Sequence, residues 1–126
     1  MIPYSHQSID GEDLRSVREV LESDWMTQGP KIKEFESALA DYCGAKYAVV
    51  ISNGTAALQA AYFAAGIGPG DEIITSPITF AATSNAAIWQ GATPVFVDVE
   101  RSTGNIDANL IEEKITGKTK AIVAVD

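Results

Sequence analysis

The chain has 126 residues, of which 46% are hydrophobic and 21% are charged, and these are ordinary values for one globular domain. Its net charge of −8 argues against nucleic acids and anionic membranes as main partners. The single Cys and the single His exclude an internal disulfide and a Cys-based zinc site. Since the sequence has neither a long apolar run nor a signal-peptide pattern, we expect a cytoplasmic protein.

Two amphipathic helices are expected near the N-terminus. The first covers residues 10–23 and has acidic residues in its first turn. The second begins at Pro30, because proline suits the first helical position, and it ends at Gly44 as a left-handed cap. We expect residues 1–46 to form a helical arm outside the main layer, with Cys43 buried. The apolar faces of the two helices are Leu14, Val17, Val20 and Leu21, and Ile32, Phe35, Leu39 and Tyr42.

Short apolar strands then alternate with helices over residues 47–126. This alternation predicts an α/β fold with a mostly parallel sheet and helices on both faces. The expected strands are residues 47–51, 72–76, 91–99 and 119–125, and the expected helices are residues 56–65, 80–90 and 107–115. In the last helix we expect Asp107 as the cap and Leu110, Ile111 and Ile115 facing inward. The sheet stops where an open α/β sheet normally continues, so we expect either a minimal domain or the front part of a longer protein.

The tetrapeptide Ser52-Asn53-Gly54-Thr55 lies between an apolar strand and a helix of small residues. Helix N-termini present free N–H groups and bind phosphate, and Gly54 lets the backbone approach a ligand closely. Residues 47–99 contain no Lys or Arg, so an anion bound there must be held by N–H groups and hydroxyls. The alternative is a plain Ser or Thr helix cap, which is the more common outcome. Ser52 as a nucleophile is disfavoured, because the sequence lacks a Gly-x-Ser-x-Gly elbow.

Aromatic residues supply the other candidate positions. Phe80 follows the expected strand at 72–76, where it either stacks on a flat ligand or packs into the core. Tyr4, His6, Trp25 and Gln28 lie outside the regular elements. Such residues suit a carbohydrate or nucleotide surface, or equally a dimer interface.

Six short motifs follow one another along the chain in a recognisable order. They are Thr27-Gln28-Gly29-Pro30, Ser52-Asn53-Gly54-Thr55-Ala56-Ala57-Leu58, Gly66-Ile67-Gly68-Pro69-Gly70-Asp71-Glu72, Thr79-Phe80-Ala81-Ala82-Thr83, Gly91-Ala92-Thr93-Pro94-Val95-Phe96-Val97-Asp98 and Lys118-Thr119-Lys120-Ala121-Ile122-Val123. In order and spacing the chain resembles the DegT/StrS family of sugar-nucleotide aminotransferases, which have the aspartate-aminotransferase (type I) fold. Residues 103–107 and 124–126 are most similar to its pseudaminic-acid branch.

The resemblance implies a cofactor, substrates and site residues. The cofactor would be pyridoxal 5'-phosphate (PLP), with its phosphate bound by Asn53, Gly54, Thr55 and Ala56 and its ring stacked on Phe80. Tyr4, Asp24, Trp25, Met26 and Thr27 would border the sugar nucleotide. Members of the pseudaminic-acid branch transfer an amino group from L-glutamate to a UDP-linked 4-keto-6-deoxy-HexNAc sugar, and the family works as homodimers.

The chain also departs from the family pattern. It covers only the first part of a typical member, so residues 47–126 would form an incomplete PLP-binding domain. The lysine that forms the Schiff base is expected beyond residue 126, and no residue here is assigned as catalytic. By itself the chain is expected to be inactive. The alternatives are a short non-enzymatic protein that binds a sugar nucleotide or pairs with a partner, and another PLP branch such as a sugar 3-aminotransferase or a dehydratase.

Overall fold

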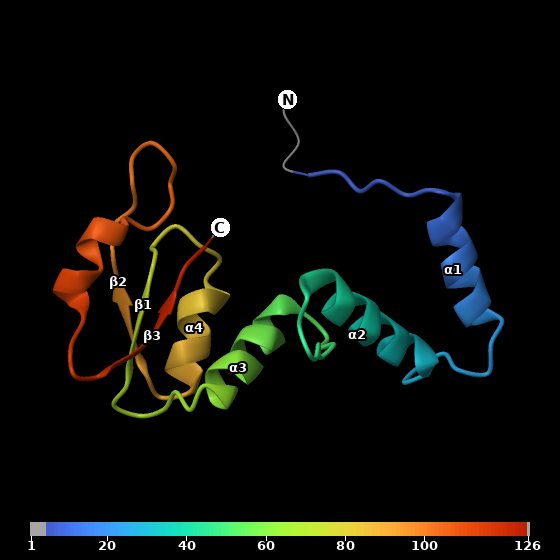
Figure 1. The fold of residues 1–126 in the computed structure, drawn as a ribbon, viewed down its shortest axis with the longest axis horizontal. Helices are drawn as coiled ribbons and strands as arrows, with labels where there is room; N and C mark the ends of the chain where they lie inside the picture. The colour runs from blue at the N-terminus through green and yellow to red at the C-terminus, as the bar shows by residue number, and fades with distance from the viewer. Residues whose placement is uncertain (1–4, 126) are drawn as a thin grey trace. The chain divides into compact units, whose positions relative to one another are not determined.

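The computed structural model describes residues 5–125, which divide into two compact units (Figure 1). The first unit ends at Val50 and the second begins at Ile51. Among the helices of the described residues, none combines the length and the apolar character needed to cross a membrane.

The first unit contains the two expected helices, α1 (Gly11–Leu21) and α2 (Pro30–Cys43). Helix α1 begins with a capping box, in which the Asp10 carboxylate accepts the N–H of Glu12 at 2.7 Å and the Asp13 carboxylate accepts the N–H of Asp10 at 2.9 Å. Helix α2 has Pro30 in its first turn and ends at Gly44, whose φ of 62° is left-handed. Both predicted helix ends of α2 are therefore confirmed.

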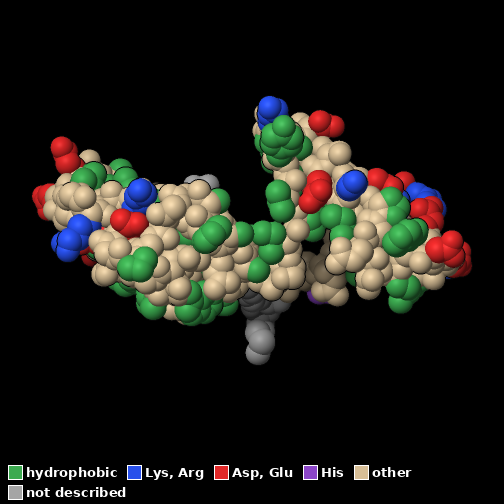
Figure 2. Space-filling view, turned by 90° about the horizontal axis from the view of Figure 1, so that it is seen from below, with side chains coloured by type: hydrophobic (Ala, Val, Ile, Leu, Met, Phe, Trp, Pro, Cys, Tyr) green, Lys and Arg blue, Asp and Glu red, His purple; other side chains and the backbone are tan. Residues whose placement is uncertain are grey.

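The apolar faces of these helices are not buried within the unit. Leu14 is 64% exposed and Phe35 is 56% exposed, and Ala40 is the one buried residue of α1 and α2 within the described chain. Figure 2 shows exposed hydrophobic side chains across the visible surface. Cys43 is exposed, so the expectation that it is buried is wrong. An amphipathic pattern alone does not bury a side chain, because burial needs a second surface.

The expected strand at residues 47–51 is not formed. Its apolar residues favour a strand, but a strand also needs a neighbour that accepts and donates ladder hydrogen bonds. In the described chain this segment has no paired strand, and the Val50 N–H donates instead to the Glu36 carboxylate at 3.0 Å. Tyr47 and Val49 are 75% and 74% exposed.

The second unit is built on a parallel sheet of β1 (Glu72–Thr75), β2 (Thr93–Phe96) and β3 (Thr119–Val123), in the order β2-β1-β3. The crossover from β1 to β2 runs in one direction along the sheet, and the crossover from β2 to β3 runs back past β1. Because both are expected to be right-handed, they lie on opposite faces. In Figure 1, α4 (Ala82–Trp89) covers one face and residues 108–114 lie on the other side.

The core of this unit lies between the sheet and its helices. Ile73 and Ile74 are both 0% exposed, so both faces of the central strand are covered. Helix α3 (Gly54–Ala64) packs on α4, and Tyr62 joins the cluster formed with Ile73. The other buried members of this cluster are Ile67, Ala86, Ala87 and Ala92. The α/β fold with a parallel sheet is therefore confirmed.

The expected helix at residues 107–115 is replaced by two short 3₁₀ helices, η1 (Ala108–Leu110) and η2 (Glu112–Lys114). Asp107 does act as a cap, because its carboxylate accepts the N–H of Asn109 at 2.9 Å. Of the three residues expected to face inward, Ile111 is half-buried, whereas Leu110 and Ile115 are 37% and 51% exposed. Asn and the β-branched residues of this segment are weak helix formers, and little apolar area is buried here to offset that.

Candidate functional site

The N-terminus of α3 holds the residues predicted to bind phosphate. Asn53, with an extended backbone at φ −167°, caps the helix, and its side-chain oxygen accepts the Ala56 N–H at 2.9 Å. Among residues 5–125 no acceptor is found for the N–H groups of Gly54 and Thr55. A Cβ built on Gly54 would meet nothing within 4 Å. The cap is thus present, made by Asn53 rather than by a Ser or Thr, and it leaves two N–H groups accessible to a ligand.

Phe80 lies in the turn between β1 and α4, beyond the carboxyl end of β1. Its side chain is 78% exposed, so the interpretation that it packs into the core is wrong for this chain. An exposed aromatic ring at the carboxyl side of a parallel sheet is placed where α/β folds bind ligands. Phe80 and residues 53–56 belong to the same unit.

These residues fit a phosphate ester that carries a flat ring. The helix N-terminus attracts the phosphate charge, the Thr55 hydroxyl adds a donor, and the Phe80 face offers a stacking surface. The absence of Lys and Arg from residues 47–99 leaves N–H groups and hydroxyls as the donors within that segment. An anion bound at this turn would therefore be held by uncharged donors of that segment.

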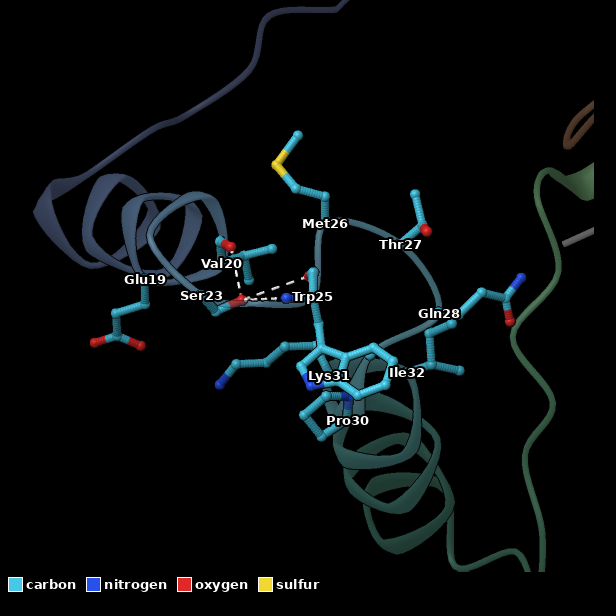
Figure 3. Close-up of a pocket in the computed structure, with 11 residues that line it drawn as sticks. Glu19, Val20, Ser23, Trp25, Met26, Thr27, Gln28, Pro30, Lys31 and Ile32 are labelled. Atoms are coloured by element: carbon cyan, nitrogen blue, oxygen red, sulfur yellow. Dashed lines mark hydrogen bonds between the residues drawn. The ribbon is translucent and has the colours of Figure 1, made fainter.

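A second set of predicted residues lies in the loop between α1 and α2, in the first unit. Trp25, Met26 and Thr27 line a pocket of about 200 Å³, whereas Asp24 is not among its lining residues (Figure 3). Tyr4 lies outside the described residues. Figure 3 shows the Trp25 ring directed toward the first turn of α2 and Met26 directed to the other side of the loop.

The same pocket contains residues that the sequence analysis missed. Glu19 and Val20, from the last turn of α1, and Ser23, which follows the helix, also line it. Ser23 lies beyond the C-terminus of α1, so helical spacing does not connect it with Glu19, and no pattern in the sequence marks these residues. The Ser23 hydroxyl accepts the Trp25 N–H at 3.1 Å and so orders the start of the loop.

The loop ends in a tight contact between Trp25 and Gly29. A Cβ on Gly29 would lie 2.6 Å from the Cβ of Trp25, so no side chain fits there. Gln28 has a φ of 63°, which is uncommon for a residue other than glycine. The Gly29 position is thus required for the close approach of Trp25 to the start of α2.

The six lysines of the chain are all exposed; they are Lys31, Lys33, Lys46, Lys114, Lys118 and Lys120. The Lys31 ammonium donates to Glu34 at 2.8 Å, and this hydrogen bond, together with the charge of Glu34, raises the pKa of Lys31. A lysine that forms an imine needs a lowered pKa, so the shift of Lys31 runs in the opposite direction.

Comparison with known proteins identifies the group to which this chain belongs. The family model of the DegT/DnrJ/EryC1/StrS aminotransferases matches residues 7–126. The chain belongs to this aminotransferase family. The spore coat polysaccharide biosynthesis protein SpsC of Bacillus subtilis (strain 168) is 50% identical over 124 residues, which are 98% of this chain and 32% of SpsC.

Solved structures of this family agree with the fold. Helicobacter pylori PseC, an aminotransferase involved in the biosynthesis of pseudaminic acid, has a TM-score of 0.90 at 43% identity, covering 98% of this chain and 34% of PseC. The putative sugar aminotransferase Spr1654 of Streptococcus pneumoniae, in its PMP-form, has a TM-score of 0.90 at 38% identity, covering 98% of this chain and 31% of Spr1654. Spr1654 is also known in a PLP-form, and PLP is the cofactor of this group. The chain spans about a third of the length of these relatives.

Proposed function

We propose that the complete protein containing this sequence is a PLP-dependent aminotransferase that acts on a sugar nucleotide. The observation that carries the proposal is the capped N-terminus of α3, where Gly54 and Thr55 keep free N–H groups beside open space. The exposed ring of Phe80, in the same unit, adds a stacking surface. The match of the family model to residues 7–126 supports the same conclusion.

The predicted cofactor residues have different parts in this proposal, and Ala56 has no phosphate contact in it, because its N–H already donates to the Asn53 side chain. Asn53 fixes the first turn of α3 by accepting the Ala56 N–H, and Gly54 and Thr55 donate to the phosphate. Phe80 holds the ring by stacking. When bound, PLP supplies the electron sink of an amino transfer, and the protein supplies orientation and charge. The lysine that binds the cofactor covalently would come from outside residues 1–126.

The loop between α1 and α2 is proposed to border the sugar nucleotide. Trp25, Met26 and Thr27 line its pocket, and the Trp25 ring, 59% exposed, provides a flat surface for a sugar or a base. Asp24 and Tyr4 are kept as part of this predicted set. For the substrates, we propose L-glutamate as the amino donor and a UDP-linked 4-keto-6-deoxy-HexNAc sugar as the acceptor. We also propose that the complete protein is a homodimer in the cytoplasm. The resemblance of residues 103–107 to the pseudaminic-acid branch supports this choice.

The cofactor proposal is tested on the complete gene product. The protein is incubated with PLP, reduced with borohydride, digested and analysed by mass spectrometry. We expect one reduced pyridoxyl adduct per chain, on a lysine outside residues 1–126. If no adduct forms, the proposal is wrong and the non-enzymatic sugar-nucleotide-binding alternative takes its place.

The phosphate contact is tested by removing one hydroxyl. Thr55→Val is expected to weaken PLP binding roughly tenfold or more, because a hydrogen bond to a charged group contributes about 1.5–3 kcal/mol. Thr116→Val is the control, because the Thr116 hydroxyl bonds Glu72 at 2.6 Å at the amino end of β1. Equal PLP affinities for the two variants would contradict the assignment of Thr55.

The substrate loop is tested with matched tryptophans. Trp25 and Trp89 are 59% and 55% exposed, but only Trp25 belongs to the proposed loop. Binding of a UDP-sugar, measured by calorimetry, is expected to weaken in Trp25→Ala and to stay unchanged in Trp89→Ala. Unchanged binding by Trp25→Ala would rule out this loop as the sugar-nucleotide site.

A further inference from the structure

The turn that carries Phe80 combines exposed apolar side chains with buried polar ones. Ile78 and Phe80 are 60% and 78% exposed, whereas Ser76 and Thr83 are 1% and 7% exposed. The position of the Phe80 ring is therefore not set by packing of the ring itself. It has to be set by whatever holds the backbone on either side of it.

Hydroxyl groups hold that backbone. The Ser76 hydroxyl accepts the Ile78 N–H at 3.1 Å, before Phe80. The hydroxyls of Thr79 and Thr83 lie 2.8 Å apart and connect the residue before Phe80 with the first turn of α4. The Thr83 N–H donates to the Phe80 carbonyl at 3.0 Å, at the start of α4.

Tyr62 ties this turn to α3. Its hydroxyl donates to the Thr83 carbonyl at 2.9 Å, while its ring lies in the core and is only 4% exposed. Burial raises the pKa of Tyr62, so the hydroxyl keeps its proton and remains a donor at neutral pH. Since α3 also begins at Gly54, one helix presents the free N–H groups at its start and anchors the Phe80 turn further along.

We propose that Tyr62 and Thr79 are positioning residues that fix the Phe80 ring relative to the N-terminus of α3. This inference rests on the proposed function, in which one PLP molecule spans the two places with its phosphate and its ring. The distance between the phosphate and the ring of that ligand is set by its covalent structure. Both protein surfaces must therefore be held at a matching separation, and functional groups need to be placed within about 0.5 Å.

A purely structural role predicts a different result from a positioning role. If the hydroxyls only stabilise the fold, removing one lowers the unfolding midpoint of the cofactor-free protein and leaves the geometry of the bound cofactor unchanged. If they position Phe80, the affinity for PLP and the induced circular dichroism of the bound cofactor change as well. Thr79→Val removes the hydroxyl at nearly constant volume, and Thr79→Ser retains it.

The experiment compares Thr79→Val, Thr79→Ser and Thr116→Val in the complete gene product. Thr116→Val is the matched control, since it removes a bonded hydroxyl at the other end of β1. We expect Thr79→Val to weaken PLP binding by up to about tenfold, the equivalent of one lost hydrogen bond, and to reduce the induced dichroism. Thr79→Ser and Thr116→Val are expected to match the wild type in both readouts.

Tyr62→Phe provides a second variant, because it removes only the bond to the Thr83 carbonyl. It is expected to change the dichroism of the bound cofactor in the same direction as Thr79→Val. If the wild type binds PLP and both variants bind it with unchanged affinity and dichroism, the positioning role is overturned while the proposed function stands. If the wild type itself does not bind PLP, the proposed function fails and this inference fails with it.

Discussion

Ile73 of β1 and Leu14 of α1 are both large aliphatic residues on regular elements, yet Ile73 is 0% exposed and Leu14 is 64% exposed. The same difference in exposure separates the two units as a whole. In the second unit both faces of the central strand β1 are covered, since Ile73 and Ile74 are 0% exposed, whereas in the first unit α1 contains no buried residue. An apolar face is therefore buried only where another surface packs on it, and in the described residues the second unit provides such a surface for β1.

The largest expected effect comes from truncating one buried and one exposed aliphatic side chain. In the 126-residue chain, Ile73→Ala is expected to lower the free energy of unfolding by about 2–5 kcal/mol, because it opens a cavity in the core. Leu14→Ala is expected to change it by no more than about 0.5 kcal/mol, as for other surface substitutions. Urea unfolding followed by circular dichroism measures both.

A Leu14→Ala variant as costly as Ile73→Ala would mean that the apolar face of α1 is covered in solution. The same pair in the complete gene product extends the comparison. An increase in the cost of Leu14→Ala there would identify α1 as a surface that the rest of the protein covers.

The second prediction concerns the close contact between Gly29 and Trp25 in the first unit. Gly29→Ala is expected to cost about 1–3 kcal/mol, since its Cβ would lie 2.6 Å from the Cβ of Trp25 and one of them must move. In a Trp89→Phe background the fluorescence of Trp25 is expected to shift in the same variant. Gly11→Ala is the control, because a Cβ on Gly11 meets nothing within 4 Å. An unshifted Trp25 emission would show that the loop relaxes around the methyl group.

The smallest expected effect is a dependence of stability on pH that comes from Tyr62 in the second unit. Burial raises the pKa of Tyr62 above its usual value of 10.0, so the folded state favours the protonated phenol. The contribution of the protonated Tyr62 phenol to the free energy of unfolding is therefore fully present below pH 10, and it is lost as the pH rises through the raised pKa. Between pH 9 and pH 11, the wild type is expected to lose more stability than Tyr62→Phe. Tyr42→Phe, at a residue that is 90% exposed, is expected to follow the wild type.

The sequence predicts correctly those helices and strands whose ends are marked by residues within the element or next to it. Helix α2 was delimited by Pro30 and Gly44, and β1 by its apolar run after a glycine-rich turn. The segment 47–51 has the same apolar character as β1, but in the described chain no strand pairs with it. Residues 107–115 have a capping residue but too little buried area to form an α-helix. In both cases the deciding factor was a tertiary contact, which a local pattern does not contain.

The candidate site shows the same division. The phosphate-binding turn and Phe80 were located from the sequence because each follows a predicted strand directly, although their roles in binding stay predictions. The hydrogen bond between Tyr62 and Thr83 was not predictable from local patterns, since it joins residues 21 positions apart on two different helices. The loop that brings Trp25 close to Gly29 includes the left-handed backbone of Gln28, which no residue preference would predict.

The strand order β2-β1-β3 has a consequence for amide hydrogen exchange. In a parallel sheet, successive residues of a strand direct their N–H groups to alternate sides. The amides of β1 are therefore protected on both sides, whereas every second amide of β2 and β3 faces an unpaired edge. The register of β1 and β3 shifts between Glu72 and Ile73, which pair with Thr119 and Ala121, so Lys120 interrupts the regular pattern. Exchange rates should thus alternate from one residue to the next over the regular part of β3, from Ala121 to Val123. Loss of that alternation in the complete gene product would reveal a further strand paired with β3, residue by residue.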